Sequence, residues 1–84
     1  MRKAYKVLLE PRAQKELDKV PAQDFAKIDK AIHALGENAR PFGAKKLDEH
    51  IHRIRVGDWR VLYAIIDKEM RVVVLRVARR NEKT

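Results

Sequence analysis

Arginine residues gather in one short stretch of the chain, RIRVGDWR, at residues 53–60. A Gly-Asp pair at positions 57 and 58 is typical of a two-residue turn between antiparallel strands, and with this turn Arg55 faces Arg60. Two like charges directly opposite each other destabilise a sheet, by about 0.2 to 1 kcal/mol. Because guanidinium groups bind phosphate oxygens through paired N–H donors, the stretch predicts a site for an anionic ligand.

More basic residues lie close to this hairpin in the predicted fold. One more arginine of the stretch shares the outer face of the hairpin, and an Arg-Arg pair follows the last predicted strand. A concave sheet could therefore gather four or five guanidiniums around one phosphate backbone, and two adjacent lysines could extend the basic surface. A solvated basic surface without a ligand is the alternative. The candidate site residues are Arg53, Arg55, Arg60, Arg79, Arg80, Lys45 and Lys46.

The net charge of the chain also favours an anionic partner. Its 84 residues include 20 Lys and Arg against 12 Asp and Glu, which gives a formal net charge of +8 and a pI of about 10.1. Nucleic acid is the first expectation, and an acidic protein or an anionic membrane surface follows. Cysteine is absent, so disulfides and thiolate zinc ligands are excluded, and a cytoplasmic location is expected.

Other kinds of site have little support in the sequence. The longest apolar run, 61–66, is far shorter than the ~20 residues of a membrane span, and the N-terminus lacks a signal-peptide core. The histidines lack metal-ligand spacing and no phosphate-binding glycine loop or nucleophile-base set is present, so neither a metal nor a cofactor is expected. His33 is predicted on the surface and His52 on the inner face. His50, in a turn near the arginines, is a candidate acid or base.

The first half of the chain predicts one strand and two helices. Residues 4–9 alternate with a period of two, which indicates a strand with one buried face. Pro11 can begin a helix because its missing N–H falls among the unpaired donors of the first turn, and that helix must end before Pro21. The next helix carries an apolar stripe at Phe25, Ile28, Ile32 and Leu35. Two antiparallel helices, an αα-hairpin, are the simplest arrangement.

The second half predicts strands, after a loop that contains Gly, Asn and Pro. They are expected at 51–56, 59–66 and 72–77, with a shorter one around 45–48 and turns at 57–58 and 67–70. The last strand is apolar on both faces and should be central. The helices should cover the hairpin face that carries His52, Ile54, Val56, Trp59, Val61, Tyr63 and Ile65. The opposite face carries Arg53, Arg55, Arg60, Leu62 and Ala64.

Together these elements predict one α+β domain over residues 1–84: a twisted antiparallel β-sheet of four to five strands with an N-terminal helical hairpin packed on one face. The segments LDKVP, KKLDEHIHRIRVGDWRVLYAI and VVVLRVARRNE make the chain resemble, over nearly its whole length, the RelE/ParE superfamily of small bacterial and archaeal toxins. The hairpin RIRVGDWRVLY and the ending V-x-R-R are more similar to the RelE branch than to the ParE branch. The resemblance implies the same fold.

The resemblance also implies a function. RelE-like toxins of toxin-antitoxin modules enter the ribosomal A site and cut mRNA there as metal-independent endoribonucleases, and a cognate antitoxin silences them in a hetero-oligomer. The ribose 2′-OH attacks its own 3′ phosphate, so the toxin must stabilise an anionic phosphorane. By this resemblance, Arg60 and Arg80 clamp the scissile phosphate. Arg53 and Arg55 hold flanking phosphates and the reacting ribose. The implied partners are an antitoxin, the ribosome and mRNA, with no membrane.

Two departures from the RelE pattern leave the mechanism open. Some members have lysine in place of Arg55, and a lysine can become a base whereas an arginine stays protonated, so proton removal has no assigned residue. RelE-like chains also commonly carry a tyrosine a few residues past V-x-R-R, and this sequence ends at Thr84 without one. The expectations are a shortened C-terminus, a weakened activity, or a substitute such as Phe42 or His50.

Two other interpretations of the sequence stay open. A ParE-like toxin would act on DNA gyrase by protein binding. A catalytically weak or inactive RelE-like module would only bind RNA and its antitoxin, and the missing tyrosine favours this one.

Overall fold

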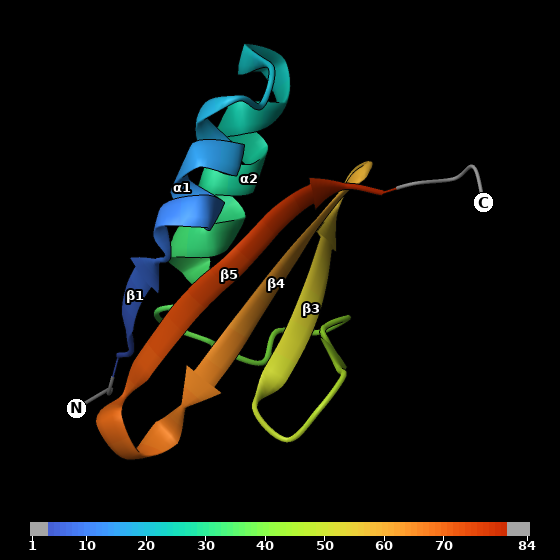
Figure 1. Cartoon of the computed structure of the whole chain (residues 1–84). Coiled ribbons are helices and arrows are strands. Elements are labelled where there is room, and N and C mark those ends of the chain that lie inside the picture. The colour runs from blue at the N-terminus through green and yellow to red at the C-terminus, as the bar shows by residue number, and fades with distance from the viewer. Residues whose placement is uncertain (1–3, 81–84) are drawn as a thin grey trace.

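The computed structural model of the chain describes residues 4–80. This part of the chain folds into two α-helices and a five-stranded sheet, and Figure 1 shows both helices on one face of the sheet. The predicted α+β class with an N-terminal helical hairpin is confirmed. In chain order the elements are β1 (Lys6–Leu9), α1 (Pro11–Asp18), α2 (Ala22–Ala34), β2 (Lys45–Lys46), β3 (Ile51–Val56), β4 (Trp59–Ile66), the 3-10 helix η1 (Asp67–Glu69) and β5 (Arg71–Arg79).

The strands lie in the order β1-β5-β4-β3-β2. β5 is central, between β1 and β4, as the apolar residues on both of its faces predicted. One pair departs from the prediction, because β1 runs parallel to β5 and the sheet is therefore mixed instead of antiparallel throughout. The period-two pattern of β1 identifies a strand. It contains no information on the direction of a partner that lies at the other end of the chain.

Proline residues determine where both helices begin. Pro11 is the first residue of α1, and Glu10 before it is extended, with φ −69° and ψ 155°. The carbonyl of Pro21 accepts the backbone N–H groups of Asp24 and Phe25, at 2.9 Å each, in the first turn of α2. α1 ends before Pro21, as predicted. The helical hairpin is thus fixed by two residues that cannot donate a backbone N–H.

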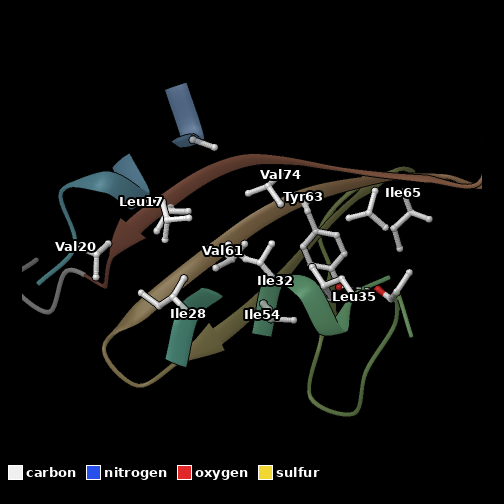
Figure 2. Close-up of a cluster of buried hydrophobic side chains, with 14 residues drawn as sticks. Leu17, Val20, Ile28, Ile32, Leu35, Ile54, Val61, Tyr63, Ile65 and Val74 are labelled. Carbon is white, nitrogen blue, oxygen red and sulfur yellow. Dashed lines mark hydrogen bonds between the residues drawn. The ribbon is translucent and has the colours of Figure 1, made fainter. Parts of the chain in front are cut away.

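The hydrophobic core lies between the helices and the inner face of the sheet (Figure 2). Its largest fully buried side chain is Tyr63, whose hydroxyl donates to the carbonyl of Ala39 at 2.8 Å. His52 is also buried and its ring stacks on Tyr63, with 5.8 Å between the ring centroids, so it lies on the inner face as predicted. Each buried Ile, Leu or Val contributes about 1.5 to 3 kcal/mol. The other fully buried large side chains are Ile28, Ile32, Leu35, Ile65, Val61, Val72 and Val74.

A β-bulge interrupts the pairing of β4 with β5. Leu62 pairs with Arg76 but Tyr63 pairs with Val74, so β5 has one extra residue, Leu75, at this point. Side chains alternate between the two faces of a strand, and an extra residue shifts the alternation by one. Residues 72 and 74 face the core before the bulge, and residue 77 faces it afterwards. Residues 78 and 80 are thereby turned to the outer face.

Candidate anion-binding site

Three arginines of the outer sheet face come from the β3-β4 hairpin. Its register agrees with the prediction, since Arg55 lies opposite Arg60 and Arg53 lies opposite Leu62. Gly57 has φ +59°, a left-handed conformation that this tight turn requires and that glycine adopts without strain. Because both helices cover the other face, the three arginines project from the uncovered side of the sheet.

A fourth arginine reaches the same face from the end of β5. Arg79 pairs with Trp59 on the inner face, so the side chain of the next residue, Arg80, lies on the outer face. The backbone N–H of Arg80 donates to the carbonyl of Asp58, in the hairpin turn, at 2.6 Å. Without the extra residue of the bulge, the alternation along β5 would turn Arg80 to the core side. We refer to Arg53, Arg55, Arg60 and Arg80 as the four-arginine cluster.

Electrostatic repulsion shows that these guanidiniums lie close together. The pKa of Arg55 is lowered from its ordinary value, mainly by the charge of Arg80 and then by the charge of Arg53. Desolvation and the charge of Arg60 act in the same direction. Each neighbouring guanidinium disfavours the charged form of Arg55. The cluster is therefore a region of high positive potential.

None of the four guanidiniums has a hydrogen-bond or ion-pair partner within residues 4–80. The Nε atoms of Arg53 and Arg60 are moreover shielded from solvent, and their N–H groups donate to no acceptor. A shielded N–H that stays unpaired costs about 1 to 3 kcal/mol. An anion on the outer face would reduce the repulsion and would accept N–H groups of the exposed Arg55. The four-arginine cluster therefore has the donors and the charge of an anion-binding site.

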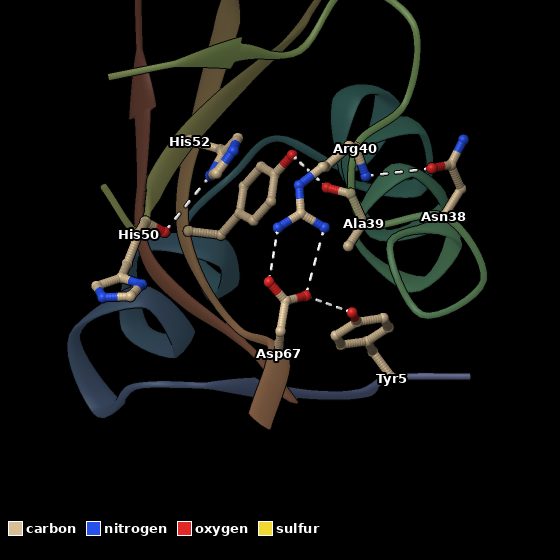
Figure 3. A network of polar contacts seen from close by, with 8 residues as sticks. Tyr5, Asn38, Ala39, Arg40, His50, His52 and Asp67 are labelled. Carbon is tan, nitrogen blue, oxygen red and sulfur yellow. Dashed lines mark hydrogen bonds and ion pairs between the residues drawn. The ribbon is translucent and has the colours of Figure 1, made fainter. Parts of the chain in front are cut away.

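A second polar cluster lies at the other end of β4 (Figure 3). Arg40 donates to both carboxylate oxygens of Asp67, at 3.4 and 2.9 Å, and the hydroxyl of Tyr5 donates to the same carboxylate. Hydrogen bonds from Arg40 and Tyr5 lower the pKa of Asp67 from its ordinary value, and the bond to Asp67 raises the pKa of Tyr5. Each of these three side chains therefore has a hydrogen-bond partner within the cluster. They join the segment before β1, the loop after α2 and the start of η1.

His50 lies near this second cluster, contrary to the expectation that it lies near the arginines. The charge of its protonated form contributes to the lowered pKa of Asp67, and its carbonyl accepts the N–H of Ile65 at 2.9 Å. From His50 to Arg55 the chain follows β3 away from this cluster for five residues, or about 16 Å at 3.3 Å per residue. His50 therefore does not join Arg55 and Arg60 at the tip of the hairpin.

The other predicted basic residues fall on different faces. Arg79 lies on the inner face, where its guanidinium carbon is 4.8 Å from the centroid of the Trp59 ring. Lys45 pairs with Arg53 and so extends the outer face. Lys46 pairs with residue 52, whose side chain is in the core, and so points to the other side. The structure thus places Lys45 beside the four-arginine cluster and separates Arg79 and Lys46 from it.

The remaining expectations concern an aromatic group, a metal and a membrane. Phe42 lies in the loop before β2 and its side chain is fully exposed. A tyrosine past V-x-R-R would fall after Arg80, outside the described residues. Within residues 4–80, no group of His, Asp and Glu side chains is arranged to hold a metal ion. No helix in the described part of the chain is long and apolar enough to cross a membrane.

A sheet that is covered on one face by a helical hairpin is the fold of solved toxins of the RelE/ParE superfamily. The family model described as "ParE toxin of type II toxin-antitoxin system, parDE" matches residues 7–84. The chain belongs to this family.

Several proteins that are similar to the chain are toxins named RelE. "Putative toxin RelE1" of Methanocaldococcus jannaschii is 26% identical over 82 residues, which cover 92% of this chain and 91% of that protein. A chain of the toxin-antitoxin complex RelBE2 from Mycobacterium tuberculosis is 29% identical, with a TM-score of 0.78 and coverage of 92% of this chain and 99% of that chain. The isolated E. coli RelE toxin shares the fold, with a TM-score of 0.84 at 23% identity, over 95% of this chain and 88% of that one. The chain is thus a RelE-like member of the type II toxins.

Proposed function

We propose that this toxin is a metal-independent endoribonuclease that cuts mRNA in the ribosomal A site and so inhibits translation in the cytoplasm. The observation that carries the proposal is the four-arginine cluster: four cations on an uncovered sheet face, with no partner in residues 4–80. The net charge of +8 adds a general attraction to RNA. The similarity to RelE toxins supports the choice of mRNA over other polyanions.

In this reaction the ribose 2′-OH attacks the adjacent 3′ phosphate, and the bond from phosphorus to the 5′ oxygen breaks. The products are a 2′,3′-cyclic phosphate and, once the leaving 5′ oxygen has taken up a proton, a 5′-hydroxyl end. Negative charge accumulates on the phosphorane between these two steps, and prearranged guanidiniums stabilise it without having to reorganise. We assign Arg60 and Arg80 to the phosphorane. Arg53 and Arg55 hold the flanking phosphates and the ribose.

The lack of protein partners fits this assignment. Within residues 4–80 no acceptor occupies the guanidinium donors of Arg53 and Arg60, and a guanidinium binds phosphate oxygens through a pair of parallel N–H groups. The cluster supplies positive charge and donors but no base, because a guanidinium stays protonated at neutral pH. Removal of the 2′-OH proton is therefore a task for a group outside the cluster.

We also propose a cognate antitoxin as the partner that silences the toxin. The crystal structures of similar chains include complexes of RelE with RelB, from Mycobacterium tuberculosis and from E. coli. Formation of a toxin-antitoxin hetero-oligomer would place an acidic surface of the antitoxin against the uncovered sheet face, because that face carries unpaired cations.

The experiment that tests the proposed function maps mRNA ends in a translation reaction with and without the protein. The expected result is new 5′ ends within the codon of the A site, and only on mRNA that is bound to ribosomes. Intact A-site mRNA together with ribosome binding would instead support a module that binds RNA without cleavage.

Inhibition of DNA gyrase is a second candidate function, because the matching family is described as ParE. A toxin of that kind would trap broken DNA in a gyrase cleavage-complex assay and would leave mRNA intact. Trapped DNA with intact mRNA would overturn the ribonuclease proposal in favour of gyrase inhibition.

A further inference from the structure

The end of β5 is held at two neighbouring points. The backbone N–H of Arg80 donates to the carbonyl of Asp58 at 2.6 Å. One residue earlier, the guanidinium of Arg79 lies over the ring of Trp59, its partner in the register of β4 and β5, with Cζ 4.8 Å from the ring centroid. A guanidinium at this distance from an indole ring makes a favourable cation-π contact. Both contacts join the end of β5 to the β3-β4 hairpin, one at its turn and one at the first residue of β4.

Trp59 is itself fixed by helix α2. Its Nε1–H donates to the carboxylate of Asp24 at 3.1 Å, and its ring packs against the margin of the core. Asp24 lies in the first turn of α2, where the helix dipole also favours a negative charge. A continuous series of contacts therefore runs from α2 through Trp59 to Arg79, which is next to Arg80 in the chain.

Arg80 needs this support more than the other members of the four-arginine cluster. Arg53, Arg55 and Arg60 lie within the paired strands β3 and β4, and the ladder of backbone hydrogen bonds holds them. Arg80 follows the last residue of β5, and the guanidinium of Arg55 repels it. Repulsion acts to separate the end of β5 from the hairpin tip. The bond to Asp58 and the contact of Arg79 with Trp59 oppose this movement.

We propose that Trp59 and Arg79, with Asp24 behind them, form a clamp that positions Arg80 for the anionic ligand of the four-arginine cluster. The nature of that ligand rests on the proposed function, whereas the clamp itself does not. Arg80 contacts the phosphate. Arg79 acts through Arg80, although its charge and its place in the sequence suggest a direct RNA contact.

The first test needs no RNA. Amide hydrogen exchange, followed by NMR, should become about two- to five-fold faster at the backbone N–H of Arg80 in the Arg79→Ala variant, which is the change expected for loss of one exposed cation-π contact. The N–H of Tyr63, in the middle of β4, should not change. Asp24→Ala should give a smaller increase at the Arg80 N–H. Unchanged exchange at this N–H in Arg79→Ala would overturn the clamp.

Arg71 provides a matched control for this test. It is an arginine at the other end of β5, half-exposed and outside the four-arginine cluster, so Arg71→Ala makes the same change in charge on the same strand. Exchange at the Arg80 N–H should be as slow in this variant as in the wild type. An equal acceleration in Arg71→Ala and Arg79→Ala would assign the effect to net charge and would reject the clamp.

The second test separates positioning from direct contact. The affinity for a fluorescent single-stranded RNA oligonucleotide, measured by anisotropy, should fall about two- to five-fold in Arg79→Ala relative to Arg71→Ala. Arg79→Lys, which keeps a cation over the ring, should retain most of the affinity. In the Arg80→Ala background, Arg79→Ala should cause no further loss, because the two residues act through one contact.

Additive losses in the double variant would mean that Arg79 touches RNA itself, and this result would overturn the positioning role. A wild-type protein that binds RNA but leaves A-site mRNA intact would overturn the proposed function, while the exchange and affinity measurements would still decide on the clamp. The two proposals can therefore fail separately.

Discussion

Two groups of arginines in this toxin have opposite surroundings. Arg40 and Arg76 each meet a carboxylate, at 2.9 Å for Asp67 and 3.0 Å for Glu16. The four-arginine cluster, in contrast, has no carboxylate partner within residues 4–80. The paired arginines tie together segments that are distant in the chain. The unpaired ones repel one another and contribute nothing comparable to the fold.

The difference agrees with the proposed function of the four-arginine cluster. The chain has 12 acidic residues, so carboxylates are available, and they are used where an arginine joins two elements. Glu16 of α1, for example, accepts both the Nε–H of Arg76 and the backbone N–H of Val77, at 2.8 Å. The proposed anion site requires cations that have no partner in the fold, and their mutual repulsion lowers stability. Four substitutions test this distinction, beginning with the largest expected effect.

Replacing Arg60 with alanine should reduce mRNA cleavage by about 100- to 1,000-fold, as the loss of one prearranged donor at a developing anion does in other enzymes. The thermal midpoint should stay the same or rise slightly, because Arg60→Ala removes a charge that repels Arg55. Arg71→Ala is the control and should change cleavage by less than about two-fold. Unfolding of Arg60→Ala would mean that this residue is structural, and the distinction between the two groups of arginines would fail.

Replacing Glu16 with alanine should lower the stability of the fold, whereas Arg60→Ala should lower mRNA cleavage. The variant loses the acceptor of both Arg76 and the Val77 N–H, so the free energy of unfolding should fall by about 1 to 3 kcal/mol in a urea titration. Glu69→Ala, which breaks the more exposed pair with Arg71, should cost at most about 1 kcal/mol. Equal losses in the two variants would show that the contact between α1 and β5 is no stronger than a surface ion pair.

The part of the four-arginine cluster that could be predicted from sequence is the part with local signals. A Gly-Asp turn fixes the register of the two strands beside it, and the register in turn fixes which side chains share a face. The opposition of Arg55 and Arg60 and the burial of His52 followed from this one turn. The helix boundaries near Pro11 and Pro21 followed from the geometry of proline in the same way.

The rest of the cluster depends on β5, where the sequence is uninformative. Its apolar run has large side chains on both faces, so periodicity cannot locate the extra residue at Leu75 that turns Arg80 outward. The strand also extends to Arg79, beyond its predicted end, and consecutive residues of a strand point to opposite faces. For that reason Arg79 and Arg80, which look equivalent in the sequence, lie on different sides of the sheet.

Long-range polar contacts could not be predicted from the sequence either. Tyr5, Arg40 and Asp67 are distant in the chain and come from three different segments, and no motif relates them. Lys45 and Lys46 were predicted together as an extension of the basic surface, and the structure makes Lys45 the register partner of Arg53. Lys46, its neighbour in sequence, faces the other way. Pairing between strands, more than proximity in sequence, decides which residues can share the site.

The pairing of Asp67 predicts a pH dependence that the four-arginine cluster should not show. Hydrogen bonds from Arg40 and Tyr5 lower the pKa of Asp67 in the folded state, so its contribution to stability is present above the unfolded value of about 3.9 and is lost as the pH falls through the lower, folded value. Asp67→Asn should therefore be less stable than the wild type at neutral pH, and the two stability curves should converge below about pH 4. Urea titrations at several pH values measure this. If the free energies of unfolding of Asp67→Asn and the wild type still differed by the same amount at pH 2, the contact would not depend on the charge of Asp67.

The smallest expected effect is the release of repulsion within the four-arginine cluster. Arg55→Gln keeps a long polar side chain but removes the positive charge that the neighbouring arginines repel, so the free energy of unfolding should rise slightly. The gain should diminish in 1 M salt, where the Debye length is about 3 Å and charges on an exposed face no longer repel strongly. Lys30→Gln, at an exposed position on α2, makes the same change in net charge away from the cluster and should leave stability unchanged. A loss of stability in Arg55→Gln would show that Arg55 supports the fold as the paired arginines do, and the cluster would then have to be redefined without it.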